Sequence, residues 1–375
     1  MDKIAIIGTG YMARIIATRA REIGVESHCF SNDRNSVAGE VADFFHYVNI
    51  LDVDSLLNLC KKYEINGVVA TTELTIWPAA YVAHHMGLVG NNLNVAEKIT
   101  DKIAVRLKTS NVEGLHHPAF WICHDAENVP KIDNYPVIVK PIAAGGKRGI
   151  SVVKSQTELC NAINSAISVS KIEGALIEEY ISGGQEYSVE SLSFKGKHYI
   201  LQVTQKDSSG PPHCVELGHH QPAAITGEMR KQVEEVVSGL LSAAGITNGP
   251  CHTEIKIVAG KIYLIEINGR PGGDHIAYPL TELSTGYPYI TGIIMAALGK
   301  LDENRLKSLE SNFCGVHFVT TQTAHLKEIF DSCEDKPWLY KKNEVSKELL
   351  PITHNDGFNT NYFIYFDRNK RPEFK

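Results

Sequence analysis

Apolar residues in the first quarter of the chain form short runs that alternate with patterns of helical spacing. A helical pattern over residues 12–23 follows the first run, and Asp54 is expected to cap a second helix. The predicted strands of this unit are residues 3–7, 28–30 and 67–71. Strands that alternate with helices predict a parallel, doubly wound sheet.

The rest of the chain shows longer apolar runs with fewer helices between them. Ser155 and Glu158 have the spacing of a capping box before one helix, and Gly245 is expected to end another. The predicted strands are residues 137–140, 150–153, 176–181, 186–194, 198–205, 314–321 and 362–366. This pattern predicts an α+β region built around an antiparallel sheet.

The most informative segment is residues 253–273, which reads as two strands joined by a tight turn. Side chains alternate along a strand, so Glu266, Asn268 and Arg270 are expected on one face, within reach of Glu254. The carboxylate oxygens of the two glutamates and the amide oxygen of Asn268 are ligands that suit Mg²⁺, and the guanidinium of Arg270 can bind a phosphate or a carboxylate. A solvated face with ordinary charges is the alternative, but the apolar flanks and the following Pro-Gly-Gly favour a binding site.

A lysine and a glycine-rich loop provide a second candidate site. Lys140 ends a strand that reads as buried, where a lysine needs a partner. In the loop that follows, Gly145, Gly146 and Lys147 are suited to wrap a phosphate. We expect a phosphate contact from Lys140 rather than a solvated strand end. Lys102 alone would be a surface lysine in most proteins.

A third segment has the features of a nucleotide hinge. A nucleobase needs one backbone donor, one backbone acceptor and an apolar floor, and a nearby carboxylate can accept both ribose hydroxyls. The candidates are Glu178, Glu179, Tyr180 and Ile181 for the hinge, and Glu186 for the ribose.

Composition narrows the function. The chain has 375 residues, which predicts two or three domains, and a formal charge of −6 gives no basic footprint for nucleic acid. Its eight cysteines are scattered without a C-x-x-C pair, which indicates reduced thiols in a cytoplasmic protein rather than zinc or disulfides. No apolar run approaches a membrane span, and the start lacks the features of a signal peptide.

The order of these elements resembles the ATP-grasp superfamily over roughly residues 1–300. The resemblance implies an α/β and α+β fold in which two antiparallel sheets clamp ATP. The implied units are an N-terminal doubly wound domain (1–95), a helical connector (96–125), a central lid (126–190) and a C-terminal ATP-grasp domain (191–375).

The resemblance also implies roles for the candidate residues. Lys102 and Lys140 match the phosphate-contacting lysines. Glu254, Glu266 and Asn268 match the Mg²⁺ ligands, with Glu266 bridging two ions and Mn²⁺ as an alternative metal. Many members carry a serine where this chain has Gly146-Lys147, so the contacts to the γ-phosphate stay open.

Two further motifs resemble those of the branch that includes L-amino-acid ligases. The first is E-x-G-H-x-x-P, which contains Glu216 and His219, and the second is the segment that begins at Arg270. The residues implied for substrate are Glu216, His219, Arg270, Gly272, Gly273 and Asp274, and those implied for catalysis are Arg270 and Lys140. A polar loop is the alternative for the first motif.

We therefore expect an ADP-forming carboxylate–amine ligase that activates an amino acid as an acyl phosphate. The near alternative is a carboxylase of the purine or biotin type, which activates bicarbonate. The turn Gly8-Thr9-Gly10 suggests an NAD-dependent oxidoreductase as a further alternative. However, Ala13 stands where the dinucleotide-binding motif G-x-G-x-x-G has its third glycine. The last alternative is a protein that binds a nucleotide but has no catalytic activity. We expect a homodimer with amino-acid-like substrates, and leave open whether the acceptor is free or on a carrier protein.

Overall fold

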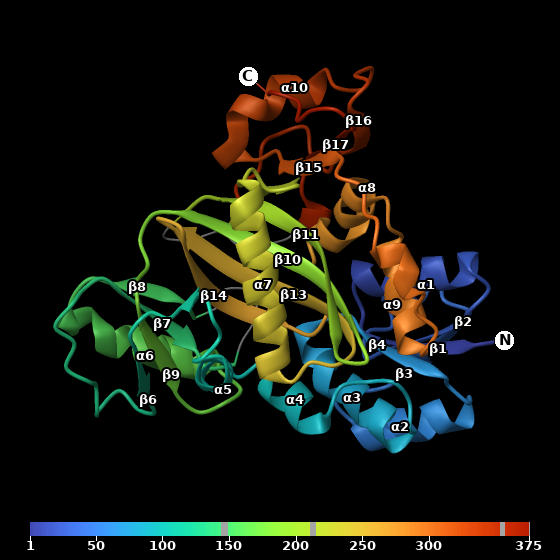
Figure 1. Cartoon of the computed structure of the whole chain (residues 1–375), viewed down its shortest axis with the longest axis horizontal. Coiled ribbons are helices and arrows are strands. Elements are labelled where there is room, and N and C mark those ends of the chain that lie inside the picture. Colours follow the sequence, from blue (N-terminus) through green and yellow to red (C-terminus); the bar gives the residue numbers. More distant parts are fainter. Residues whose placement is uncertain (144–148, 211–214, 353–356, 375) are drawn as a thin grey trace.

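The computed structural model describes residues 1–143, 149–210, 215–352 and 357–374. Within these residues the strands form three sheets, and the two termini lie on different parts of the molecule (Figure 1).

The N-terminal sheet is parallel, as predicted. Its order is β3-β2-β1-β4. Alternate residues of β1 face opposite layers, because Ile4 and Ile6 pack with helix α1 while Ala5 and Ile7 pack with α2 and α3. The elements are β1 (Lys3–Ile7), α1 (Tyr11–Glu22), β2 (Glu26–Ser31), β3 (Phe44–Tyr47), α2 (Val53–Lys62), β4 (Gly67–Ala70) and α3 (Ile76–His85).

The cap of α2 differs from the prediction by two residues. Asp52 caps the helix by accepting the N–H of Ser55, and Asp54 lies in the first turn. Both aspartates suit a helix start, since the positive end of the helix favours nearby carboxylates, so sequence alone did not separate them.

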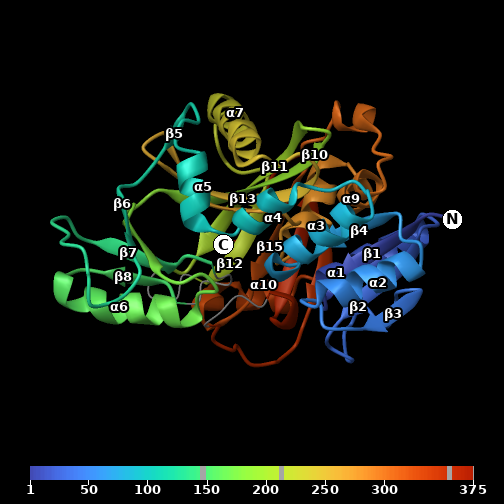
Figure 2. The same ribbon diagram turned by 90° about the horizontal axis from the view of Figure 1, so that it is seen from below.

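The largest sheet has nine strands in the order β16-β17-β15-β12-β11-β10-β13-β14-β5. Helix α7 (Gly227–Ala244) lies across one face (Figures 1 and 2) and ends at Gly245 in a left-handed conformation, as predicted. The strands are β5 (Leu115–His116), β10 (Gln185–Phe194), β11 (Lys197–Ser208), β12 (Glu216–Gln221), β13 (Gly249–Val258), β14 (Lys261–Asn268), β15 (Phe313–Phe318), β16 (Leu339–Asn343) and β17 (Tyr362–Asp367).

Strands β13 and β14 form the predicted hairpin. Ala259 and Gly260 both have positive φ, which is the backbone of a tight two-residue turn. The register places Glu254 opposite Glu266. These two candidate metal ligands are therefore cross-strand neighbours.

A smaller antiparallel sheet has the order β6-β9-β7-β8. Helix α6 (Gln156–Val169) covers it with Leu159, Ile163 and Ala166. Ser155 stands at the N-cap as predicted, but its side chain makes no capping bond; Glu158 instead accepts the N–H of Lys154. The strands are β6 (Phe120–Cys123), β7 (Val137–Pro141), β8 (Ser151–Val153) and β9 (Ala175–Glu179).

The remaining elements connect and cover the sheets. Figure 1 shows α9 beside α1, and the two share one apolar core. These elements are η1 (Glu73–Thr75), α4 (Leu93–Lys98), α5 (Lys102–Lys108), η2 (Ile276–Thr281), α8 (Glu282–Thr285), α9 (Tyr289–Ala297), η3 (Glu303–Leu306), η4 (Thr321–Leu326), α10 (Lys327–Asp331) and η5 (Gly357–Asn359).

The domain limits stay a prediction. The limit expected at residue 190 falls inside β10, which runs unbroken through the nine-stranded sheet. The seven cysteines that the structure describes are all free, and Cys214 lies outside the described residues. Among the helices of the described chain, none has the length and apolar character needed to cross a membrane.

Candidate active site

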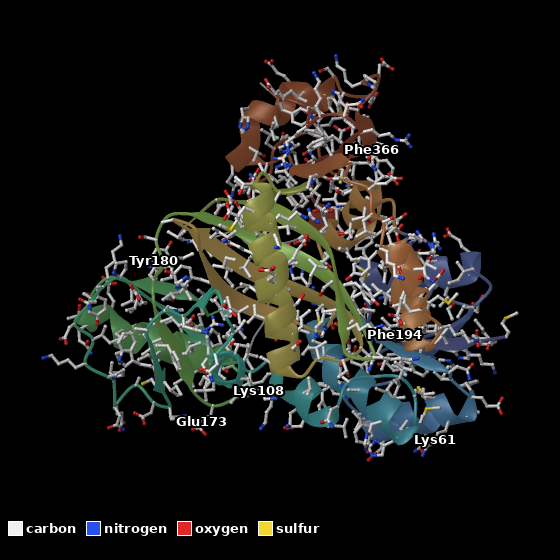
Figure 3. The ribbon with its side chains drawn as sticks, viewed as in Figure 1. Lys61, Lys108, Glu173, Tyr180, Phe194 and Phe366 are labelled. Carbon is white, nitrogen blue, oxygen red and sulfur yellow. The ribbon has the colours of Figure 1, made fainter. Side chains whose placement is uncertain are left out.

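A cavity of about 340 Å³ lies between the small sheet and the nine-stranded sheet. Figure 3 shows Tyr180 where the lobe of the small sheet meets the larger one. The sequence-predicted residues that line this cavity are Lys102, Lys140, Glu178, Glu179, Tyr180, Ile181, Glu186, Glu216, Glu254, Glu266, Arg270, Gly273 and Asp274. Residues that are far apart in the sequence therefore meet around one space.

Three predicted site residues lie beside this cavity without lining it, namely His219, Asn268 and Gly272. Asn268 instead lines a small cavity behind Glu266. Gly145, Gly146 and Lys147 lie outside the described residues.

Lys140 has the partner that a buried lysine requires. Its ammonium lies 2.5 Å from Glu178, and the other oxygen of Glu178 accepts a 2.7 Å hydrogen bond from Arg106. Burial alone would raise the pKa of Glu178, but Lys140 and Arg106 lower it to about 2. The Glu178 side chain thus serves these two cations, and only its backbone is left for the predicted hinge.

The hinge segment has apolar and cationic neighbours. Ile138, Val152 and Leu264 line the cavity near it and supply an apolar floor. Lys256 donates a 2.8 Å hydrogen bond to the carbonyl of Ile181. One of the two lone pairs of the Ile181 carbonyl is therefore engaged by Lys256.

Glu254 and Glu266 face the cavity from neighbouring strands. Lys102 approaches Glu266 at 3.6 Å, and Asn268 donates a 2.8 Å hydrogen bond to the other oxygen of Glu266. The nearby carboxyl of Glu73, which shares the small cavity, has its pKa raised first by burial and then by the charge of Glu266. Carboxylates and their cationic partners thus share the region where the metal was predicted.

Lys206 joins the predicted metal face to the predicted substrate face. It is buried, with its ammonium 2.8 Å from both Glu216 and Glu254. Burial alone would lower the pKa of Lys206, but the two glutamates raise it above its ordinary value. This lysine stays charged and holds the two carboxylates together.

His219 lies behind Glu216 on β12. Its ring is fully buried, and its Nε2 is 3.3 Å from Glu216. Burial lowers the pKa of His219 to about 3, so the ring is neutral near pH 7. A register shift between Gly218 and Glu216 leaves the side chains of Glu216 and His219 on the same face of β12. The His219 ring does not line the cavity, and its contact with substrate stays a prediction.

Arg270, Gly273 and Asp274 form the wall next to Glu216. Arg270 makes no ion pair with any described carboxylate, and its guanidinium donates a 2.9 Å hydrogen bond to the carbonyl of Pro271. A Cβ added at Gly273 would have no atom within 4 Å, so this backbone is open to the cavity. Burial and then Glu216 raise the pKa of Asp274 to about 6.

Gly272 does not offer its amide to the cavity. Its N–H donates a 3.0 Å hydrogen bond to Glu190, a fully buried carboxylate on β10. The predicted substrate role of this amide is therefore not supported by its contacts, since the bond points into the protein.

Sequence reasoning missed four charged residues of this region: Glu73, Arg106, Lys206 and His252. The available signal was a charged side chain inside an otherwise apolar element. Arg106 is four residues after Lys102 on α5, and Lys206 lies in β11, which carries Leu201 and Val203 in the core.

Comparison with known proteins agrees with this geometry. Residues 133–278 match the family described as ATP-grasp domain. A formate-dependent phosphoribosylglycinamide formyltransferase from Prochlorococcus marinus is 24% identical over 225 residues, which are 58% of this chain and only 55% of that enzyme.

Solved structures match almost the whole chain. L-amino acid ligase from Bacillus licheniformis superposes with a TM-score of 0.82 at 21% identity, over 98% of this chain and 94% of the ligase. The biotin carboxylase domain of 2-oxoglutarate carboxylase from Hydrogenobacter thermophilus, in complex with MgADP and bicarbonate, has a TM-score of 0.75 at 18% identity, over 98% and 86% of the two chains.

Likeness at these identities establishes the fold, and the matched domain agrees with the motifs in the sequence. The chain therefore has the ATP-grasp fold, as its sequence predicted, and its residues 133–278 match the ATP-grasp domain.

Proposed function

We propose that this protein is an ATP-dependent, ADP-forming carboxylate–amine ligase that acts on an amino acid or a similar small acid. The observation that carries the proposal is the single cavity in which Lys140, the hinge segment, Glu254, Glu266 and Arg270 meet. Each of these groups answers one need of phosphoryl transfer: phosphate contact, base recognition, metal ligation and orientation of the acid.

ATP would lie with its base on the apolar floor and its phosphates toward the lysines. Lys140 is held at the cavity by Glu178, and Lys102 approaches from the start of α5. Glu186, which also lines the cavity, is placed to accept the ribose hydroxyls. The phosphate role of the glycine-rich loop stays a prediction from the sequence, because residues 144–148 lie outside the described residues.

The residues present fit magnesium. The described residues contain no cluster of three or more His, Cys, Asp or Glu side chains that would bind a metal unaided. Mg²⁺ usually takes few protein ligands and completes its shell with phosphate and water, so Glu254, Glu266 and Asn268 suffice as a set. The geometry supports this fit, because Glu254 and Glu266 lie opposite each other on paired strands and both line the cavity.

Bound magnesium would neutralise charge on the transferring phosphoryl group. The residues of the chain then have three tasks. Arg270 would hold the acid with its planar fork beside the γ-phosphate, and the open backbone at Gly273 gives that carboxylate room. Lys140 would offset charge on the phosphates. The apolar floor would help to exclude water, which would hydrolyse an acyl phosphate.

The reaction proposed has two steps. A carboxylate oxygen of the acid forms a bond to the γ-phosphorus, and the bond to ADP breaks. An amine then forms a bond to the acyl carbon, phosphate leaves, and the amine loses a proton. The amino group of the first substrate would lie near Glu216 and Asp274, which share one wall of the cavity.

A carboxylase that activates bicarbonate is the second candidate, supported by the likeness to a biotin carboxylase domain. Arg270, which forms no ion pair with a described carboxylate, suits either an organic carboxylate or bicarbonate. We favour the amino-acid ligase because Glu216 and Asp274 place negative charge where a substrate ammonium would bind, and bicarbonate has no such group. The homodimer, the cytoplasmic location and the nature of the acceptor stay predictions.

The test is a screen for ADP release over pairs of amino acids, with bicarbonate in a separate well. We expect at least one pair to drive ADP release and bicarbonate alone to be inactive. Release with bicarbonate alone would refute the ligase in favour of the carboxylase.

The Arg270→Lys variant tests the orientation of the acid. It keeps the charge but loses the two-pronged fork, so ligation should fall about 100-fold or more while ATP affinity by calorimetry changes little. Arg14→Lys is the matched control, because Arg14 forms one exposed ion pair with Glu40 far from the cavity. Normal ligation by Arg270→Lys would contradict the assignment.

A further inference from the structure

Glu190 is a fully buried carboxylate on β10, behind the wall of the active-site cavity. The register of β10 and β13 places it directly opposite His252. Its oxygen Oε1 contacts Nδ1 of His252 in a short ion pair, and the other ring nitrogen of His252 lies 3.2 Å from Glu254. One side of Glu190 is therefore connected to a proposed metal ligand.

The second oxygen of Glu190 has a different task. Oε2 accepts a 3.0 Å hydrogen bond from the N–H of Gly272 and lies 3.4 Å from the hydroxyl of Tyr289. Gly272 lies between Arg270 and Gly273, which line the cavity. The same carboxylate is thus bonded to the loop that carries the proposed acid-binding arginine.

Gly272 is adapted to this contact. A Cβ at this position would lie 2.6 Å from Oε1 of Glu190 and 2.7 Å from Nδ1 of His252. Such distances are too short for any side chain, so only glycine lets the backbone approach the buried pair. The close approach leaves the loop little freedom to shift relative to β10 and β13.

A buried ion pair needs an explanation other than stability. Removing a carboxylate and an imidazolium from water is costly, and apolar replacements of similar volume are often as stable or more stable. A pair that holds two separate parts of an active site has a use that apolar residues cannot supply, because they form no directed bonds to a backbone N–H.

We propose that Glu190 is a positioning residue that fixes the acid-binding loop at Gly272 and, through His252, the metal-facing carboxylate of Glu254. This proposal rests on the proposed function and adds to it a fixed distance between the acid and the metal. In-line transfer requires that distance, because a misplacement of about 1 Å costs on the order of 100-fold in rate.

Two substitutions of Glu190 separate the effect of side-chain length from the effect of its charge. Glu190→Asp keeps the charge but is one methylene shorter, so one carboxylate can no longer reach both Gly272 and His252. Glu190→Gln keeps the length and an acceptor for the Gly272 N–H. We expect Glu190→Asp to raise KM for the acid and lower kcat by about 10- to 100-fold each, and Glu190→Gln to retain most of the activity.

A second measurement does not depend on turnover. ATP binding is measured by calorimetry with magnesium and with a chelator. Glu190→Asp should reduce the gain in affinity that magnesium provides, by about tenfold, and leave the affinity in chelator unchanged. If the unmodified protein releases no ADP with any substrate, the proposed function fails. The increase in ATP affinity that magnesium provides, compared between the unmodified protein and Glu190→Asp, still tests the role of Glu190.

Glu282 provides a matched control. Its carboxylate also holds both a basic side chain, Arg19, and a backbone N–H, that of Ile290, at 2.9 Å each. This pair packs near α1 and does not line the cavity. Glu282→Asp should therefore leave KM, kcat and the magnesium gain unchanged.

Gly272→Ala keeps the proposal testable should Glu190→Asp fail to fold. Its added Cβ would displace the loop from Glu190, whereas Gly269→Ala meets its nearest atom only at 3.6 Å. We expect a raised KM for the acid in Gly272→Ala and an unchanged KM in Gly269→Ala. The proposal is overturned if Glu190→Gln is as damaging as Glu190→Asp, if Glu282→Asp has the same effects, or if folded Glu190→Asp or Gly272→Ala is normal.

Discussion

The group of Arg106, Glu178 and Lys140 allows a quantitative prediction. Glu178 is 1% exposed and is the carboxylate between two buried cations. Glu178→Gln keeps the shape of the side chain and removes its charge. Arg106 and Lys140 would then face each other across a neutral amide in a poorly solvated site.

The size of the effect follows from the pKa. The pKa of Glu178 falls from an ordinary value of 4.5 to about 2, because Lys140 and Arg106 outweigh burial. That shift corresponds to about 3 kcal/mol in favour of the folded state. Breaking a buried ion pair by removing one partner costs about 3–5 kcal/mol, which agrees in size. We expect Glu178→Gln to lose about 3 kcal/mol at pH 7.

The pH dependence has a definite sign. A carboxylate whose pKa is lowered on folding stabilises the protein fully above its unfolded pKa, and the stabilisation is lost as pH falls through the folded pKa. The difference between the unmodified protein and Glu178→Gln should therefore be constant above about pH 5 and shrink as the pH falls toward 2.

Urea unfolding at several pH values is the measurement. The double variant Glu178→Gln, Arg106→Gln should recover about 1 kcal/mol or more, because it removes one of the stranded cations. Glu282→Gln, which breaks the less buried pair with Arg19, should cost less. A loss under about 0.5 kcal/mol in Glu178→Gln, or no recovery in the double variant, would refute the reasoning.

Two further predictions concern the nucleotide and the metal. Glu266→Gln should lower ADP formation about 1,000-fold with an unchanged urea midpoint, because the charge of Glu266 is expected to bridge two metal ions, and near-normal turnover by the folded variant would contradict the metal assignment. ATP should be used well and GTP poorly, because the backbone of residues 178–181 is expected to read adenine, and equal steady-state turnover of the two nucleotides would count against that hinge.

Sequence predicted the parts of the fold that depend on local patterns. The hairpin of β13 and β14 was predicted because alternating apolar residues surround Ala259 and Gly260, which take the backbone of a tight turn. The parallel N-terminal sheet followed from alternating strands and helices. The cap at Asp52 was missed because two nearby aspartates satisfy the same local rule.

Sequence could not predict which side chains share a buried partner. Lys140 was expected at a phosphate on account of its buried strand, but its bond to Glu178 depends on the register of β7 and β9. Lys206 meets Glu216 and Glu254 only because β11 lies next to β12 and one strand away from β13. These contacts join residues with no regular spacing along the chain.

Arg270 shares the cavity of Glu266 for a reason other than strand alternation. Alternation placed Glu266, Asn268 and Arg270 on one face, but β14 ends at Asn268. Glu266 and Asn268 lie on one face, joined by a 2.8 Å hydrogen bond, and Arg270 lines the large cavity together with Glu266 although it lies beyond the strand. A pattern of period two holds only while the strand continues.

The fold and the reaction rest on different parts of this molecule. A formyltransferase, a ligase and a carboxylase domain all resemble the chain, so the shared sheets do not select the acid. On the proposed function, we expect the selecting groups among the cavity residues Glu216, Arg270, Gly273 and Asp274. There Lys206 already neutralises part of the charge of Glu216, while Asp274 is held by the N–H of Gly357 from the C-terminal segment. If the proposed function holds, the choice of substrate depends on a wall built by three distant segments, and substitutions in that wall should alter specificity before they alter ATP binding.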